Sequence, residues 1–85
     1  MYSIIISSAA NRDYKRLPQS EILKINKVID HLASNPRPSG YKKLKDRNAY
    51  RIRIGNYRII YEINDKDVIL FVIRIRHRKE VYKNL

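Results

Sequence analysis

The first half of the chain carries a short apolar run followed by residues with helical spacing. Residues 2–7 are rich in β-branched side chains and end in serine, which predicts a first strand. Ser7 or Ser8 can cap a short helix that runs to about Leu17, where Pro18 ends it. A second, longer helix follows from Pro18. Its apolar positions 22, 25, 29 and 32 recur at helical spacing, and the proline-containing segment 35–40 ends it.

The second half has the pattern of three strands joined by short turns. Residues 50–54 alternate between polar and apolar side chains, and Gly55-Asn56 is a two-residue turn signal. Residues 57–63 return as a second strand, residues 64–67 turn again, and residues 68–75 form a third strand with a nearly continuous apolar run.

These elements predict one α+β domain spanning residues 1–85. Its order is β-α-α-β-β-β, with an N-terminal strand and a two-helix hairpin packed on a small, mostly antiparallel four-stranded sheet. The helices must cover one face of that sheet, because no other element can bury it.

The net charge of the chain gives information about its binding partner. Nineteen Lys and Arg residues against eight Asp and Glu give a net charge of +11. Residues 1–40 contribute six basic and three acidic groups (+3), and residues 41–85 contribute thirteen and five (+8). Such an excess indicates a polyanionic partner, whether nucleic acid, an anionic membrane surface or an acidic protein, although a merely soluble surface is the alternative.

Other composition features exclude several classes of function. The chain has no cysteine, which excludes disulfides, thiol nucleophiles and thiolate metal sites. Its apolar start is much shorter than the roughly 20 residues of a membrane span and lacks the features of a secretory signal. We therefore expect a cytoplasmic protein with no membrane partner.

The strongest candidate for chemistry is the predicted hairpin at residues 50–61. With Gly55-Asn56 as its turn, Arg53 lies opposite Arg58, and alternation places Arg51 on the same face as both. Like charges opposite one another destabilise a sheet, so three converging guanidinium groups indicate an anion site. An exposed strand face kept soluble by arginine is the competing interpretation.

Arginine suits the binding of a phosphate. It stays charged and can donate two parallel hydrogen bonds to phosphate oxygens, and it can stabilise charge that develops on them. Arginine transfers protons poorly, so a proton carrier must come from elsewhere. The candidates lie in the basic tail: His77, whose ordinary pKa is near 6.5, and Tyr82. Both residues also have a plain interpretation, as an exposed histidine and a packing tyrosine.

Further basic residues are candidates for binding RNA. They lie in the irregular segment after the second helix and along the end of the last strand, and they are Lys42, Lys43, Lys45, Arg74 and Arg76. A solvated loop without a specific role is the alternative for the three lysines.

The absence of some motifs narrows the chemistry. No acidic pair occurs at metal-ligand spacing on a predicted face, and two glycines cannot form a glycine-rich phosphate loop. We expect neither a metal nor another cofactor. A metal-independent enzyme on nucleic acid points to RNA, whose 2′-hydroxyl can attack the adjacent phosphate.

The run from Tyr50 to Tyr61, followed by His77-Arg-Lys-Glu-Val-Tyr82, resembles the RelE/ParE superfamily of bacterial and archaeal toxins. Asn35-Pro36 and residues 40–44 also match the usual run-in of that family. The resemblance covers essentially the whole chain. It implies two N-terminal helices on a small antiparallel sheet, and a type II toxin held inactive by an acidic RelB-like antitoxin in a heterotetramer or another toxin–antitoxin assembly.

In the RelE branch, the resemblance implies a ribosome-dependent endoribonuclease that cuts mRNA in the A site and inhibits translation. Position by position, it implies a catalytic role for five residues, which are Arg51, Arg53, Arg58, Arg78 and Tyr82. His77 is a sixth candidate, because it resembles a histidine of related branches. RelE itself has lysines at two of these positions, where this chain has Arg51 and Arg53. Since arginine is a poor base, this difference raises the standing of His77. The alternatives are a ParE-type toxin that inhibits DNA gyrase and a non-catalytic RNA-binding relative.

Overall fold

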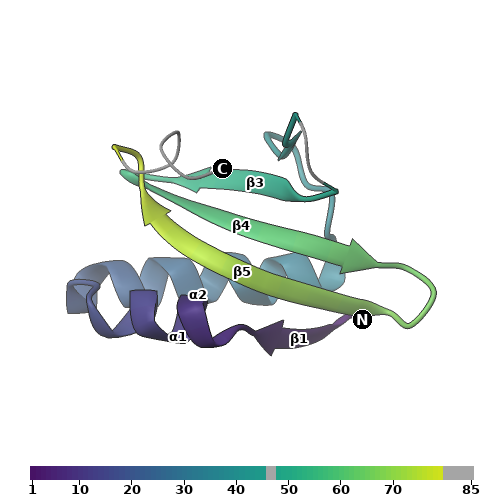
Figure 1. The fold of residues 1–85 in the computed structure, drawn as a ribbon, viewed down its shortest axis with the longest axis horizontal. Helices are drawn as coiled ribbons and strands as arrows, with labels where there is room; N and C mark the ends of the chain where they lie inside the picture. The colour runs from purple at the N-terminus through teal and green to yellow at the C-terminus, as the bar shows by residue number, and fades with distance from the viewer. Residues whose placement is uncertain (46–47, 80–85) are drawn as a thin grey trace.

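The computed structural model describes residues 1–45 and 48–79, which form a two-layer α+β fold. Two helices pack on one face of a twisted sheet, and α2 lies behind the sheet in the view of Figure 1. The helices are α1 (Ser8–Lys15) and α2 (Gln19–Ser34). The strands are β1 (Ser3–Ile6), β2 (Lys42–Lys43), β3 (Tyr50–Ile54), β4 (Tyr57–Asn64) and β5 (Ile69–His77).

The helix boundaries follow local chemistry. The Ser7 hydroxyl accepts a hydrogen bond of 3.0 Å from the backbone N–H of Ala10, which confirms it as the cap of α1. The same hydroxyl donates to the carbonyl oxygen of Ile73 at 2.7 Å, so the cap also fixes α1 to the sheet. Pro18 immediately precedes α2, as predicted.

The sheet differs from the prediction in its strand count. Within the described residues it has five strands in the order β1-β5-β4-β3-β2, because Lys42 and Lys43 pair with β3 instead of forming a loop. β1 runs parallel to β5, and the other three pairings within the sheet are antiparallel. The expectation of a four-stranded sheet was therefore wrong by one short edge strand. Lysines exposed on both faces of an edge carry no apolar alternation, so the pattern gave no strand signal.

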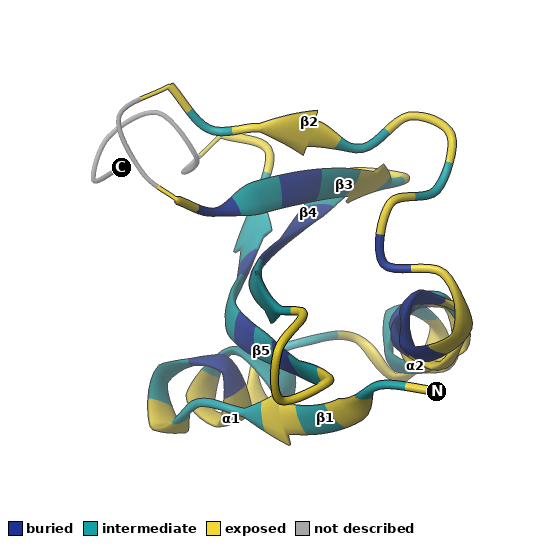
Figure 2. Cartoon of the chain, turned by 90° about the vertical axis from the view of Figure 1, so that its right-hand side faces the viewer, coloured by how far each residue is buried: buried dark blue, intermediate teal, exposed yellow. Residues whose placement is uncertain are grey.

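The core lies between α2 and the inner face of the central strands (Figure 2). Ile25 and Leu32 of α2 meet Ile59 of β4 and Val72 of β5, and all four side chains are almost completely buried. The two central strands that carry the candidate chemistry are thus held on their other face by the core. Neither described helix is long and apolar enough to span a membrane.

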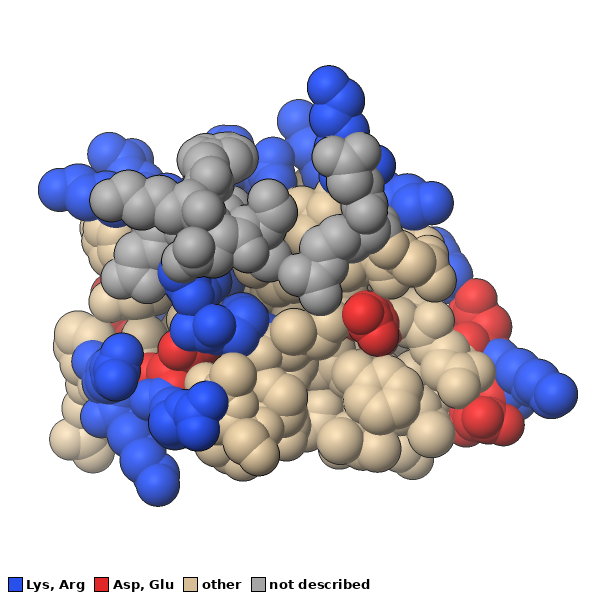
Figure 3. Space-filling model, viewed as in Figure 1, with Lys and Arg blue, Asp and Glu red and all other residues tan. Residues whose placement is uncertain are grey.

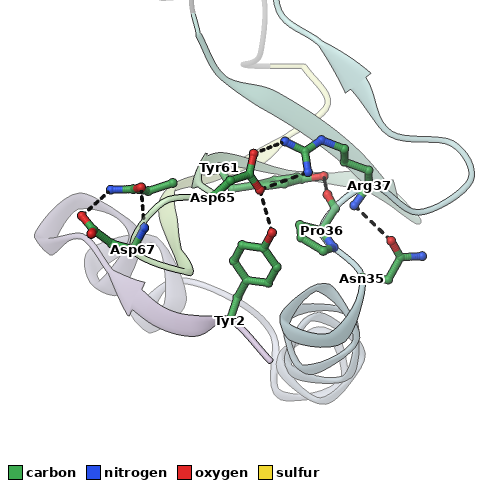
Figure 4. Close-up of polar contacts among 8 residues, drawn as sticks. Tyr2, Asn35, Pro36, Arg37, Tyr61, Asp65 and Asp67 are labelled. Carbon is green, nitrogen blue, oxygen red and sulfur yellow. Dashed lines mark hydrogen bonds and ion pairs between the residues drawn. The ribbon is translucent and has the colours of Figure 1, made fainter.

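A polar network closes the end of the molecule opposite the β3–β4 turn (Figure 4). Asp65 accepts a 2.6 Å hydrogen bond from the Tyr2 hydroxyl and forms an ion pair with the Arg37 guanidinium at 2.8 Å. These contacts lower the pKa of Asp65, with the Arg37 hydrogen bond as the largest cause. The Tyr61 hydroxyl donates to the carbonyl oxygen of Pro36 at 2.8 Å, and burial raises the pKa of Tyr61 to about 12. Tyr61 therefore keeps its proton and serves the fold.

Candidate active site

The β3–β4 hairpin pairs in the predicted register. Arg53 lies opposite Arg58, Arg51 lies opposite Ile60, and Gly55 and Asn56 form the turn. Gly55 has a φ of +56°, which glycine adopts without strain. Because side chains alternate along a strand, Arg51, Arg53 and Arg58 share one face and Ile59 lies on the other. This part of the prediction is confirmed.

Neighbouring strands extend this basic face. Arg76 of β5 lies opposite Arg58, so Arg53, Arg58 and Arg76 form a row across three strands. Lys42 of β2 lies opposite Arg51 at the other edge of the hairpin. We call this set of five residues the arginine face. Adjacent side chains in such a row are about 4.5–5.5 Å apart at Cβ, close enough for two guanidinium groups to contact one phosphate.

Two members of the arginine face are buried, which is unusual for arginine. Arg51 is 9% exposed and Arg58 is 7% exposed, whereas Arg53 is exposed. Both buried arginines interact with other groups of the protein. Their orientation is therefore restricted before any ligand arrives. This suits a group that must stabilise charge at a defined point.

Arg74, a predicted RNA-binding residue, is engaged inside the protein. Its Nε and Nη2 atoms donate to the two carboxylate oxygens of Asp13 at 2.9 and 3.1 Å. Asp13 also accepts from the backbone N–H of Ile75 at 2.8 Å. The contact joins α1 to the edge of β5 beyond the point where β1 ends its pairing. This geometry favours a structural role for Arg74.

His77 does not join the arginine face. It lies opposite Tyr57 at the end of β5, and Tyr57 shares its face of the hairpin with Ile59. The two rings meet edge to face, with centroids 5.3 Å apart and planes at 83°. The Nδ1 atom of His77 accepts from the backbone N–H of Lys79 at 3.3 Å. The structure thus places His77, the predicted proton carrier, on the opposite face of the sheet from Arg51, Arg53 and Arg58.

The remaining candidates lie around this centre. The backbone N–H of Arg78 donates to the carbonyl oxygen of Asn56 at 2.7 Å, which places Arg78 beside the hairpin turn. Lys43 lies opposite Tyr50 and therefore on the other face from Lys42, and Lys45 is exposed in the following turn. Tyr82 lies outside the described residues.

The structure also brings together residues that the sequence did not single out. Arg16, at the C-terminal end of α1, and Tyr57 line a pocket together with His77. No local motif joins these residues. Only the pairing of β4 with β5 could have revealed the Tyr57–His77 contact. Within residues 1–45 and 48–79, no three His, Cys, Asp or Glu side chains gather as a metal site.

Comparison with known proteins assigns the family. Residues 4–82 match the model of the ParE toxin of type II toxin–antitoxin systems. The chain belongs to the RelE/ParE superfamily. It is 34% identical over 84 residues to toxin RelE3 of Methanocaldococcus jannaschii, an alignment that covers 93% of each chain. It is 26% identical over 85 residues to the mRNA interferase toxin RelE of Escherichia coli, covering 95% of this chain and 90% of the relative.

The fold gives the same result. The toxin in the archaeal RelE–RelB complex from Pyrococcus horikoshii superposes with a TM-score of 0.81 at 26% identity. That superposition covers 91% of this chain and 94% of the other. The predicted α+β, RelE-like architecture is therefore confirmed, and the chain is a homologue of RelE toxins from type II toxin–antitoxin systems.

Proposed function

We propose that this protein is a metal-independent endoribonuclease that cuts mRNA in the ribosomal A site and so stops translation. The observation that carries the proposal is the arginine face. Three hairpin arginines converge where a stable sheet would carry opposite charges, and β2 and β5 add one more cation each. Similarity to an mRNA interferase supports the reading of this face as a phosphate site.

The chemistry requires no group beyond the RNA and the protein. As its proton passes to a basic group of the site, the ribose 2′-oxygen attacks the adjacent phosphorus and forms the O2′–P bond of a 2′,3′-cyclic phosphate. The P–O5′ bond then breaks, and the leaving 5′-oxygen takes up a proton. Arg51, Arg53 and Arg58 hold the phosphate and stabilise the charge that accumulates on its oxygens in the transition state. Arg78, beside the hairpin turn, can contact the flanking backbone.

Proton transfer is assigned separately from phosphate binding. The resemblance to RelE implies that the tail tyrosine, Tyr82 in this chain, aids catalysis. The imidazole of His77 is of a type that can transfer protons, but it lies on the opposite face of the hairpin from Arg58. We therefore place Tyr82 ahead of His77 as the group that exchanges a proton with the scissile phosphate.

An acidic antitoxin is the expected partner of the free toxin. A net charge of +11 favours a negatively charged protein that covers the basic face, and the P. horikoshii relative was solved as a RelE–RelB complex. We propose a RelB-like antitoxin bound in a heterotetramer or a related assembly. In its absence, the ribosome and its mRNA are the polyanions available to the toxin.

Primer extension on mRNA, with and without ribosomes, tests the proposal. We expect cleavage only with ribosomes and without added metal beyond that the ribosomes need. The Arg58→Ala and Tyr82→Phe variants should lose most of the cutting while remaining folded by circular dichroism. Lys66→Ala is the matched control, since it removes one positive charge from the exposed turn after β4 and should cut normally.

Inhibition of DNA gyrase is the second candidate, because the matching family model describes a ParE toxin. A supercoiling assay with purified gyrase separates the two activities. Intact mRNA beside inhibited supercoiling would reject the ribonuclease and establish the gyrase poison. Unchanged mRNA cleavage by both Arg58→Ala and Tyr82→Phe would show that the site lies elsewhere.

A further inference from the structure

A second basic site lies at the end of the molecule where α1 passes into α2 and where β5 ends. Here the structure has a pocket of about 370 Å³, within the size range of small-ligand sites. Figure 3 shows Lys and Arg side chains gathered at this end, on the left of the view. The residues of its lining that bear on a ligand are Asp13, Arg16, Tyr57, Arg74, Arg76 and His77.

The charge of the lining favours an anion. Three arginines and one carboxylate border the pocket, and that carboxylate, Asp13, is already bound to Arg74. The other two arginines of the lining are Arg16 and Arg76. Arg16 is exposed at the C-terminal end of α1, where its guanidinium can reach a ligand without first losing a buried contact.

The aromatic part of the lining favours a flat ring. Tyr57 and His77 are both partly exposed and line the pocket, and their rings stand at 83° to each other, so the corner between them offers aromatic surface to a ligand. Nucleobases of any identity stack on aromatic faces. The edge of a base can also donate a hydrogen bond to an imidazole or accept one from it. A phosphate-binding arginine next to such a corner matches the two halves of a nucleotide.

The pocket is continuous with the arginine face. Arg76 belongs to both, because it lies opposite Arg58 in the sheet and also borders the pocket. β1 pairs with β5 only as far as Val72, and beyond it α1 covers the edge of β5, where Asp13 accepts from the Ile75 N–H. A single-stranded RNA held on the arginine face can therefore reach the pocket past the end of β5, at Arg76 and His77, and place its next nucleotide there.

We propose that this pocket binds the nucleotide adjacent to the scissile phosphate, with its phosphate on Arg16 and Arg76 and its base against Tyr57 and His77. The inference rests on the proposed ribonuclease function and adds a binding role for His77 in place of proton transfer. It makes the pocket a determinant of which base is accepted beside the cut.

Titration with adenosine 5′-monophosphate, followed by NMR of the isolated ¹⁵N-labelled protein, tests the pocket directly. We expect shifts at the backbone amides of Arg16, Tyr57 and His77. Arg16→Ala should weaken binding by about fivefold or more, since it removes a charged contact to phosphate. Arg12→Ala removes the same charge one turn earlier, outside the pocket lining, and is the matched control.

Ribose 5-phosphate is the second probe, because it lacks the base. Binding as tight as that of the mononucleotide would overturn the aromatic half of the proposal. Shifts confined to the hairpin arginines, or no shifts, would overturn the pocket as a whole while leaving mRNA cleavage by the arginine face intact.

Sequencing of cleavage products tests the link to the substrate. His77→Ala and Arg16→Ala should change the base preference beside the cut, whereas Arg58→Ala should abolish cutting and still bind the mononucleotide. Mononucleotide binding by a wild-type protein that cuts no mRNA would refute the assignment to a substrate nucleotide and, separately, the proposed function.

Discussion

The contact between Asp13 and Arg74 provides a quantitative test of how the fold is held together. Asp13→Ala removes two hydrogen bonds to the guanidinium and one from the backbone N–H of Ile75. The Asp13 side chain is 11% exposed and that of Arg74 is 33% exposed, so solvent screens the pair only in part. We expect a coupling of about 1–2 kcal/mol, between the values for exposed and buried ion pairs.

The two single substitutions should differ. Asp13→Ala also loses the acceptor for the Ile75 amide, which adds about 1 kcal/mol, for a total near 2–3 kcal/mol. Arg74→Ala leaves that acceptor in place and should cost less. For a domain of this size, each kcal/mol corresponds to a change in melting temperature of roughly 4–8 °C.

Urea denaturation of the wild type, both single variants and the double variant yields the coupling as a double-mutant cycle. Asp13→Asn is the control, since its amide oxygen can still accept from the Ile75 N–H. Effects that add to within about 0.3 kcal/mol would refute the coupling. If Arg74→Ala left stability unchanged but weakened RNA binding, the sequence-based role of Arg74 in RNA binding would be restored.

Three further changes test other parts of the structure. Val68 has a φ of +56° and is 42% exposed. Because asparagine tolerates this conformation better than valine, Val68→Asn should raise the free energy of unfolding, measured by urea denaturation, by about 1 kcal/mol. A loss of stability would contradict this reasoning. Arg37 lowers the pKa of Asp65, so the ionised Asp65 side chain stabilises the protein above the ordinary pKa of 3.8, and this stabilisation is lost as the pH falls through the lowered pKa. Asp65→Asn should therefore flatten the acid side of a curve of stability against pH. An unchanged acid side would argue against the ion pair. Arg53→Gln relieves repulsion from Arg58, so it should raise the free energy of unfolding in urea denaturation by a few tenths of a kcal/mol while reducing mRNA cleavage in primer extension. A loss of stability together with a loss of cleavage would contradict this reasoning.

Local signals in the sequence predicted the hairpin and the helices. Gly55-Asn56 determines a two-residue turn, and once the turn is known, alternation places every side chain of residues 50–61. Ser7 is likewise a local signal, since its cap bond reaches only three residues along the chain. These features depend on neighbours in sequence, so the pattern alone was sufficient.

Other features depend on residues far apart in the chain. The Asp13–Arg74 pair joins positions 61 residues apart, and its existence follows from how α1 docks on β5. The shift in register between β4 and β5, at Ile60 and Tyr61, decides that His77 lies opposite Tyr57. No sequence period encodes an irregularity of this kind. The face on which His77 lies was therefore open until the structure placed it.

The division of the hairpin into two faces explains how a small domain can tolerate a cluster of arginines. Ile59 and Tyr61 of β4 are completely buried, and they fix the strand that also carries Arg58. Packing in the core therefore offsets the like-charge repulsion on the opposite face and prevents the arginines from moving apart. A phosphate that binds there relieves the repulsion and contacts guanidinium groups that are already oriented, so less of its binding energy is spent on ordering side chains. Substitutions on the core face should consequently reduce stability and activity together, whereas substitutions on the arginine face should separate them.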